Sequence, residues 1–212
     1  IEYDYLCATT LTYFFLDMLA KNIKSKMKLR KYLIYVLMAT VCDVMPLRKL
    51  NRLIAITALQ EFDINKDFVF KELFKLNNKK NKISIDDLGY LIGPILNSGG
   101  RLGKSNYAVD LISSEDSNLV SQRSLDLIIL NNKREEIELA TLKNIDFDKI
   151  EKENKNIIFY YDPNINEGLL GIIAARLKDY FNKPSIVITN SQNLLKSSAR
   201  STNNYNIGRA IK

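Results

Sequence analysis

Apolar residues recur at helical spacing through the first half of the chain. Four such segments predict helices at 5–20, 29–45, 51–62 and 67–76. The first, YLCATTLTYFFLDMLA, is apolar on nearly all sides, so we expect a buried helix rather than a surface one. Pro46 predicts that the second helix ends near Met45, since the residue before proline is biased away from the α region.

The segment after this helical region is richer in glycine. Glycines at positions 93, 99, 100 and 103 predict an irregular loop between two helices. From Ser113 to Lys143 the chain has no glycine or proline, and Ser113 or Ser114 is the expected cap of a long helix. Its apolar stripe is narrow, as is typical of a connecting helix, and Arg134 and Glu138 are spaced for an i,i+4 ion pair.

The last third of the chain changes its periodicity. Residues 157–162 and 184–189 are rich in β-branched and aromatic side chains and predict strands, whereas 167–181 predicts an amphipathic helix between them. A strand, a helix and a second strand within about 35 residues indicate a βαβ unit, so a parallel sheet begins a second domain here. The fold class is therefore predicted to be α/β.

Composition narrows the classes of function. The chain of 212 residues has 46% hydrophobic and 26% charged residues, and no apolar run reaches the roughly 18 to 20 residues of a membrane span. Cys7 and Cys42 are far apart, which argues against a disulfide framework or a zinc site and fits a reducing cytoplasm. Histidine is absent, so imidazole acid–base chemistry within this chain is excluded.

The charge balance is basic. Lys and Arg number 31 against 24 Asp and Glu, a net charge of +7, which suits a polyanionic partner such as a nucleic acid. The alternative is a solvated basic face, because much of the lysine occurs with Asn and Ile, as in KLNNKKNKISI, and that bias is also typical of an AT-rich genome.

Asp43 is the first candidate for chemistry. It lies in the apolar stretch ATVCDVMPL, where a carboxylate is costly unless it is paired or binds a metal ion. One interpretation is an acid at a helix end, satisfied by backbone donors or by an arginine. The other is a metal ligand.

Three further stretches could bind phosphate. GPILNSGGRLGK combines glycine backbone with Asn97, Arg101 and Lys104, although its spacing is not that of a Walker motif. In NEGLLGIIAARL, Gly168 and Gly171 lie in a first helical turn, which favours an anion or else close helix packing. KSSARST, with Ser198 and Arg200, is either a phosphate clamp or an exposed edge strand.

The order of these stretches resembles the DHH phosphoesterase superfamily, and within it the exonucleases specific for single-stranded DNA. The resemblance covers essentially all 212 residues and rests on ATVCDVMPL…NR, LGYLIGPILNSGGRLG, IILNNKREEIE, NEGLLGIIAARL…PSIVIT and KSSARS. It implies the C-terminal, largely helical part of a DHH domain (1–112), a connecting helix (113–145) and the start of a βαβ-type DHH-associated domain (146–212).

The resemblance also implies roles for single residues. Asp43 corresponds to the final ligand of a two-metal site for Mn²⁺ or Mg²⁺, whose other ligands would lie upstream of Ile1. Asn97 and Arg101 correspond to a segment that faces the DNA or the metal site, and Ser198 and Arg200 to the part that holds the 5′ end. Gly168 is a further candidate anion contact. The chain departs from the family pattern at two positions, where Ile95 replaces an arginine and Asn166 a histidine.

The activity implied is 5′ to 3′ hydrolysis of single-stranded DNA by metal-activated water, in DNA repair and recombination in the cytoplasm. The implied partner is single-stranded DNA, without a membrane, and we expect a monomer. The chain opens IEYDYLCATT and stops at NIGRAIK, so we expect an internal piece of a longer protein, nearly inactive alone. The alternatives are a phosphodiesterase for oligonucleotides or cyclic dinucleotides, and a non-catalytic nucleic-acid-binding remnant.

Overall fold

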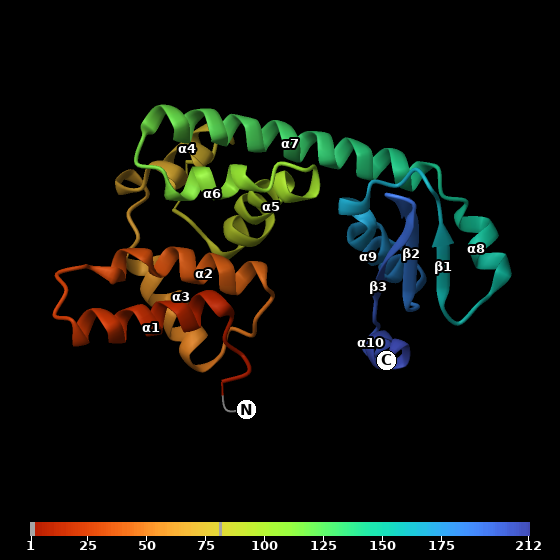
Figure 1. Ribbon diagram of the computed structural model, residues 1–212, viewed down its shortest axis with the longest axis horizontal. Coiled ribbons are helices and arrows are strands. Elements are labelled where there is room, and N and C mark those ends of the chain that lie inside the picture. Colours follow the sequence, from red (N-terminus) through yellow and green to blue (C-terminus); the bar gives the residue numbers. More distant parts are fainter. Residues whose placement is uncertain (1–2, 81) are drawn as a thin grey trace. The chain divides into compact units, whose positions relative to one another are not determined.

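The computed structural model describes residues 3–80 and 82–212, which form two compact units. Unit 1 comprises the described residues of Ile1–Asn97 and Tyr107–Asp126, and unit 2 comprises Ser98–Asn106 and Leu127–Lys212. Helices and strands are both present, which confirms the predicted α/β class (Figure 1).

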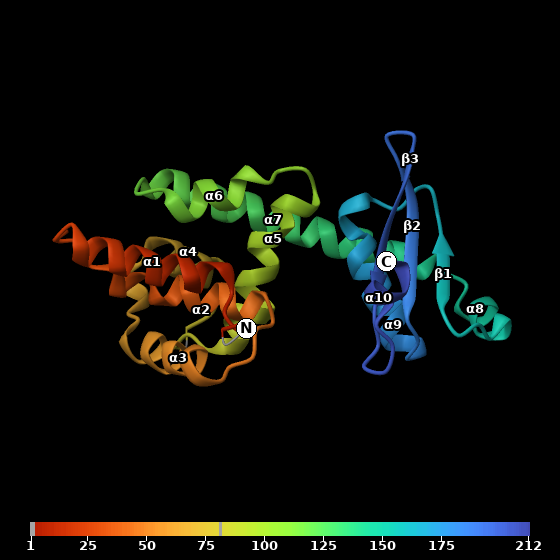
Figure 2. The same cartoon turned by 60° about the horizontal axis from the view of Figure 1, so that its bottom comes forward.

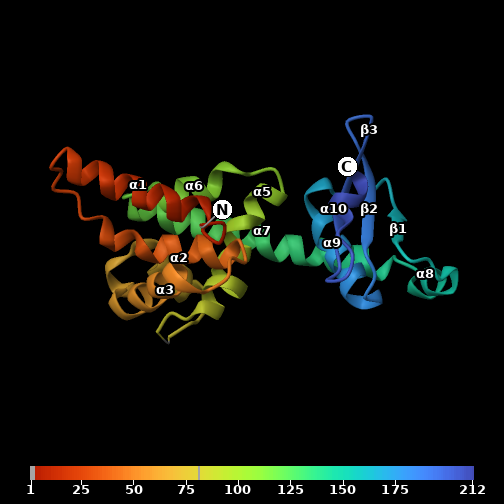
Figure 3. The same cartoon turned by 90° about the horizontal axis from the view of Figure 1, so that it is seen from below.

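Unit 1 is built from helices, with no strand among its described residues. They are α1 (Ala8–Asn22), η1 (Leu29–Tyr32), α2 (Leu33–Cys42), α3 (Lys49–Glu61), η2 (Ile64–Lys66), α4 (Phe68–Leu76), the π-helix η3 (Asp87–Ile92), most of α6 (Asn106–Ser113) and the first parts of α5 (Gly93–Arg101) and α7 (Ser117–Lys143). α2 packs against α1 and α3 (Figure 3). Its buried side chains Ile34 and Leu37, with Phe70 and Leu73 of α4, belong to the apolar core.

The helices expected at 51–62 and 67–76 are confirmed as α3 and α4, while two earlier predictions need correction. The predicted helix 29–45 is a 3₁₀ turn followed by α2, which already ends at Cys42. α1 forms as expected but is not buried, since Thr10 is its only buried residue and Phe15 is 64% exposed. α2 is the main helix packed against α1, so much of the remaining apolar surface of α1 is left uncovered by the described residues of unit 1.

The glycine-rich segment is helical rather than irregular. η3 continues directly into α5, and α5 includes three of the four glycines. Close packing explains Gly93, because a Cβ atom there would lie 2.7 Å from the sulfur of Cys42. Only Gly103, after the end of α5, has a positive φ, of 78°. Glycine therefore serves mainly to let neighbouring groups approach this helix.

Unit 2 contains a small mixed sheet covered by helices (Figure 2). Its elements are the remainders of α5 and α7, followed by α8 (Phe147–Glu153), β1 (Ile158–Tyr161), η4 (Glu167–Leu169), α9 (Leu170–Phe181), β2 (Ser185–Ser191), β3 (Leu194–Arg200) and α10 (Ile207–Ile211). β1 pairs with β2 in parallel, with Ile158 opposite Ser185, so the predicted βαβ unit is confirmed. β3 returns antiparallel through a two-residue turn at Gln192 and Asn193, both with positive φ.

The core of unit 2 lies between the sheet and α9. Ile173, Ala174 and Leu177 of α9 are fully buried and belong to one cluster with Val187 of β2 and Ile158 of β1. The alternation of buried residues along β2 places one face of that strand on this core. α9 also packs against β3, so the helix and the hairpin hold each other in place.

The long connecting helix is present as α7, although its start differs from the prediction. Ser113 is the last residue of α6, and Asp116 caps α7 by accepting the N–H of Asn118 at 2.9 Å.

α8 was not predicted, because its sequence is mostly charged. It begins where Asp146 accepts the N–H of Lys149 at 2.9 Å. The domain boundaries inferred from the resemblance stay a prediction.

Candidate phosphate pocket

Three segments far apart in the sequence line one pocket of unit 2. Its volume is about 610 Å³. The lining residues come from the end of α5 and the turn after it, from η4 and the start of α9, and from β3: Gly100, Arg101, Leu102, Gly103, Asn166, Glu167, Gly168, Leu170, Gly171, Lys196, Ser197 and Ser198. Of the predicted anion-binding residues, Arg101, Gly168 and Ser198 therefore meet at one place, which is called the phosphate pocket below.

Arg101 is half-buried at the C-terminal end of α5. Its Nη1 donates to the carbonyl oxygen of Gly168 at 3.1 Å, which fixes the guanidinium relative to η4. Burial lowers the pKa of Arg101, and the nearby charges of Arg134 and Arg200 lower it further, whereas Glu138 opposes them. The remaining N–H groups of Arg101 have no hydrogen-bond partner in the part of the chain that the structure describes.

Gly168 contributes to the pocket through its small size. A Cβ atom at this position would collide with the backbone carbonyl of Arg101, so only glycine lets η4 approach α5 this closely. Its N–H is already bonded to the side-chain oxygen of Asn166 at 2.9 Å. Asn166 thus caps η4, and the Gly168 N–H is not left over for an anion.

β3 brings Ser198 and Arg200 to the start of α9. Arg200 is exposed, and its Nη1 donates to the Ala199 carbonyl at 3.0 Å and contacts the hydroxyl of Ser198 at 3.4 Å. A Cβ atom at Gly171 would lie 2.6 Å from Nη2 of Arg200 and 3.3 Å from the Ser198 oxygen. β3 is an edge strand and also borders the pocket, so the two interpretations of KSSARST do not exclude each other.

A second pair of charges borders the pocket, and the sequence alone did not single it out. Lys196 of β3 donates to Glu167 at 2.6 Å, and Ser191 also bonds this carboxylate. These hydrogen bonds, with Lys196 as the main donor, hold the pKa of Glu167 below its usual range. Lys196 is therefore already neutralised within the protein, whereas Arg101 is not.

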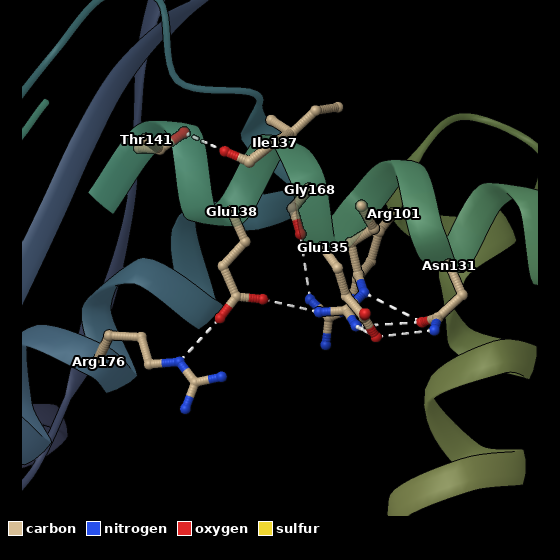
Figure 4. A network of polar contacts seen from close by, with 9 residues as sticks. Arg101, Asn131, Glu135, Ile137, Glu138, Thr141, Gly168 and Arg176 are labelled. Carbon is tan, nitrogen blue, oxygen red and sulfur yellow. Dashed lines mark hydrogen bonds and ion pairs between the residues drawn. The ribbon is translucent and has the colours of Figure 1, made fainter. Parts of the chain in front are cut away.

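Beneath these groups lies a polar network on α7 and α9 (Figure 4). Glu138 is 4% exposed and accepts hydrogen bonds from Arg134 and Arg176, each at 2.8 Å. The predicted i,i+4 pair of Arg134 and Glu138 is confirmed. Its burial could not be predicted from the spacing, because that depends on α9 packing over it.

Asn97 and Asp43 belong to unit 1. Asn97 is exposed on α5, four residues before Arg101 and so on the same side of the helix. Asp43 is the C-cap residue that directly follows α2, and it is exposed rather than enclosed by apolar walls. The structure therefore brings together candidates within unit 2, and Asp43 and Asn97 are described with unit 1.

The backbone around Asp43 is held by a left-handed residue and by several hydrogen bonds. Val44 has φ of 54°, in the left-handed region, and Met45 N–H returns to the carbonyl of Thr40 at 3.0 Å. The fully buried Asn51 donates to the carbonyls of Pro46 at 3.1 Å and Tyr5 at 2.7 Å. The turn thus presents the Asp43 carboxylate to solvent.

A carboxylate is a suitable ligand for Mg²⁺ or Mn²⁺, but Asp43 is one ligand only. No group of three or more His, Cys, Asp or Glu that could hold a metal ion occurs among residues 3–80 and 82–212. These residues therefore do not fit a complete two-metal centre.

No helix in the described part of the chain has the length and apolarity needed to cross a membrane.

Comparison with known proteins gives a consistent result. No family model matches the chain. It is 32% identical to the single-stranded-DNA-specific exonuclease RecJ of Haemophilus influenzae over 174 residues, 78% of the chain, and 30% identical to that of Bacillus subtilis over 173 residues, 79% of the chain. The chain spans only 30% and 22% of those two relatives.

Solved structures show the same likeness in fold. RecJ of Thermus thermophilus in complex with Mg²⁺ matches 91% of the chain and 30% of its own length, with a TM-score of 0.77 and 21% identity. A second structure, exonuclease RecJ bound to manganese, matches 94% of the chain and 49% of its own length, with a TM-score of 0.75 and 21% identity. The predicted resemblance is confirmed: the chain is similar in sequence and fold to a segment of RecJ.

Proposed function

We propose that the chain is part of a 5′ to 3′ exonuclease for single-stranded DNA, and that unit 2 holds the terminal 5′ phosphate of the strand. The observation that carries this proposal is the convergence of Arg101, Gly168 and Ser198 on one pocket. Arg101 and Arg200 are forked donors suited to phosphate oxygens, and the Ser198 hydroxyl adds a neutral donor. The similarity to RecJ supports the same function.

The geometry suggests distinct tasks for these residues. Arg101 is held by Gly168 and keeps further N–H groups for a ligand, so it would bind the phosphate without first breaking an internal ion pair. Arg200 is exposed on β3, so its long side chain could turn toward a phosphate from that strand. A bound 5′ end would set the polarity of degradation, because the scissile bond then lies at a fixed number of nucleotides from the pocket.

The experiment measures the affinity of the 212-residue chain for oligothymidylate with a 5′ phosphate or a 5′ hydroxyl, by fluorescence anisotropy. We expect tighter binding of the phosphorylated strand, and loss of most of that preference in Arg101→Ala and Arg200→Ala. Arg209→Ala is the matched control, since it removes an exposed arginine of unit 2 outside the pocket. Equal affinity of the wild-type chain for both strands would refute the assignment of the pocket.

We also propose that Asp43 supplies one oxygen ligand for Mg²⁺ or Mn²⁺ in the complete protein, with the other ligands outside this chain. When bound, such ions would lower the pKa of a water molecule and stabilise charge on the phosphate. Asp43→Ala in the complete protein should abolish turnover and largely preserve strand binding. A rate within a few-fold of wild type would contradict the assignment.

The substrate could instead be a short oligonucleotide or a cyclic dinucleotide. A cyclic dinucleotide has no terminal phosphate monoester, so it would not use a 5′-phosphate pocket. Comparing hydrolysis of a long strand with that of a dinucleotide by the complete protein separates the two. We expect the long phosphorylated strand to be the better substrate, in DNA repair and recombination in the cytoplasm.

A further inference from the structure

Unit 2 gathers several arginines around one buried carboxylate. Glu138 lies on α7, and Figure 4 shows one of its oxygens directed to Arg176 on α9. The other oxygen accepts a hydrogen bond from Arg134 on the same helix. Both N···O distances are 2.8 Å. The side chain of Arg134 is itself only 11% exposed, whereas that of Arg176 is 59% exposed.

Arg134 is fixed by more than Glu138. Its Nε and Nη2 donate to the side-chain oxygen of Asn131 at 3.2 and 3.1 Å, and Nη2 also donates to Glu135 at 2.9 Å. All of these partners lie on α7 (Figure 4). The guanidinium is therefore held in one orientation as a fixed positive charge.

This fixed charge acts on the phosphate pocket. Figure 4 shows Arg101, held by the Gly168 carbonyl, beside the network around Glu138. Burial is the main cause that lowers the pKa of Arg101; the positive charges of Arg134 and Arg200 lower it further, and the charge of Glu138 raises it. Glu167, the other carboxylate near the pocket, is already paired with Lys196. Glu135 also accepts a hydrogen bond from Arg134, but Glu138 is the carboxylate whose charge opposes the repulsion that neighbouring arginines exert on Arg101.

Stability alone gives little reason for such an arrangement. A buried ion pair often contributes no more than a well-packed apolar pair of the same volume, because removing both charges from water is costly. A network of charges beside an anion pocket has a different use, since the buried carboxylate and a bound phosphate would both offset positive charge around Arg101.

We propose that Glu138 is an internal counterion of the phosphate pocket, a positioning residue that holds Arg134 and Arg176 and offsets the repulsion that neighbouring arginines exert on Arg101 until a phosphate binds. This inference rests on the proposed function of the pocket. It predicts a coupling of definite sign between Glu138 and the anion. Without the carboxylate charge, the ligand-free chain is less stable and the phosphate compensates more.

The test compares the wild-type chain with Glu138→Gln, with inorganic phosphate as the probe and chloride at equal ionic strength as the reference. Thermal unfolding gives the stability at each phosphate concentration, and from it the dissociation constant. We expect a lower unfolding temperature for Glu138→Gln without phosphate, and a dissociation constant for phosphate at least three-fold lower than that of the wild type. A residue with a structural role only would lower the stability and leave the dissociation constant unchanged, which would overturn the proposal.

Asp87→Asn is the matched control, because Asp87 is a buried carboxylate paired with Lys79 in unit 1. It should lower the unfolding temperature without changing the response to phosphate.

Arg176→Ala provides a second variant if Glu138→Gln does not fold, since most of this arginine is exposed. It leaves Glu138 less neutralised, so phosphate should bind at least two-fold more weakly although Arg176 does not line the pocket. Arg209→Ala again controls for the loss of one positive charge. An unchanged constant in Arg176→Ala would overturn the proposal, whereas a wild-type chain without any phosphate response would refute the function of the pocket itself.

Discussion

Gly168 and Gly100 both lie next to Arg101, but only Gly168 is closely packed against it. Replacing each by alanine therefore distinguishes the effect of packing on stability from the effect of backbone conformational freedom. Gly168→Ala would drive a methyl group into the carbonyl of Arg101, and backbone cannot move aside as a flexible side chain can. We expect a loss at the upper end of the roughly 1–3 kcal/mol seen for overpacking. Urea denaturation monitored by circular dichroism measures this free energy of unfolding.

Gly100→Ala is the control for this substitution. Gly100 also borders the pocket, but it lies within α5 and a Cβ atom there meets no atom within 4 Å. Replacing it should stabilise the chain by up to about 0.5–1 kcal/mol, since alanine loses less conformational entropy in a helix. Similar losses in both variants would show that packing against Arg101 is not the cause.

Val44 stores backbone strain beside Asp43. It is β-branched, 87% exposed and has φ of 54°, a conformation that costs most residues other than glycine roughly 1–2 kcal/mol. Val44→Gly should therefore raise the free energy of unfolding by about 1 kcal/mol, partly offset by the greater freedom of glycine in the unfolded chain. Chemical denaturation measures the gain.

Val44→Thr keeps the β-branch and should give no gain, while Val44→Asn should be intermediate, because asparagine tolerates the left-handed region better. The same rank order is expected for hydrogen-exchange rates of the amides after Cys42. If glycine and threonine had the same effect, the left-handed backbone at this position would be wrong.

At the scale of the element, Asp87 shows how a charge anchors the start of a helix. Burial raises the pKa of Asp87, but hydrogen bonds from Lys79 at 2.7 Å and from Ser84 outweigh it and leave this pKa below its usual value. Because the folded-state pKa is depressed, the stabilisation is present above the unfolded-state pKa of about 4 and is lost as the pH falls through the folded-state value.

The free energy of unfolding of the wild-type chain should therefore decrease as the pH falls below about 4. Asp87→Asn should be less stable than the wild type at pH 7, and the difference should shrink toward low pH because the neutral amide does not titrate. Denaturation curves over this pH range check both statements. A difference independent of pH would mean that the charge of Asp87 does not contribute.

The elements also show which features a sequence can reveal. The spacing of apolar residues and the polar, glycine and proline interruptions predicted α3, α4 and the βαβ unit, because each of these depends mainly on its own residues and on the turns beside it. The exposure of α1 and the helix through Gly93 and Gly99 were not predictable in this way, since both depend on what packs against them. The order of motifs singled out Arg101 and Ser198, which line one pocket, whereas the burial of Glu138 depends on the packing of α9 and could not be predicted in this way.

At the scale of the whole molecule, the net charge of +7 offers two ways in which the proposed binding of a single strand would arise. A diffuse basic surface would bind any strand, with each cation contributing about equally. A localised site would concentrate the contribution in Arg101 of the phosphate pocket and Arg200 beside it. The dependence of affinity on salt distinguishes them, because each neutralised phosphate of a single strand adds about −0.7 to the slope of log K against log salt concentration.

We expect Arg101→Ala to reduce the steepness of this slope by about 0.7 for a 5′-phosphorylated oligothymidylate and by less for the 5′-hydroxyl strand, since the terminal phosphate is the group that Arg101 would neutralise. Arg209→Ala removes the same charge and should leave the difference between the two strands intact. Anisotropy titrations at several salt concentrations give the slopes. Equal changes in both variants would favour the diffuse surface, and the pocket would then be one basic region among several.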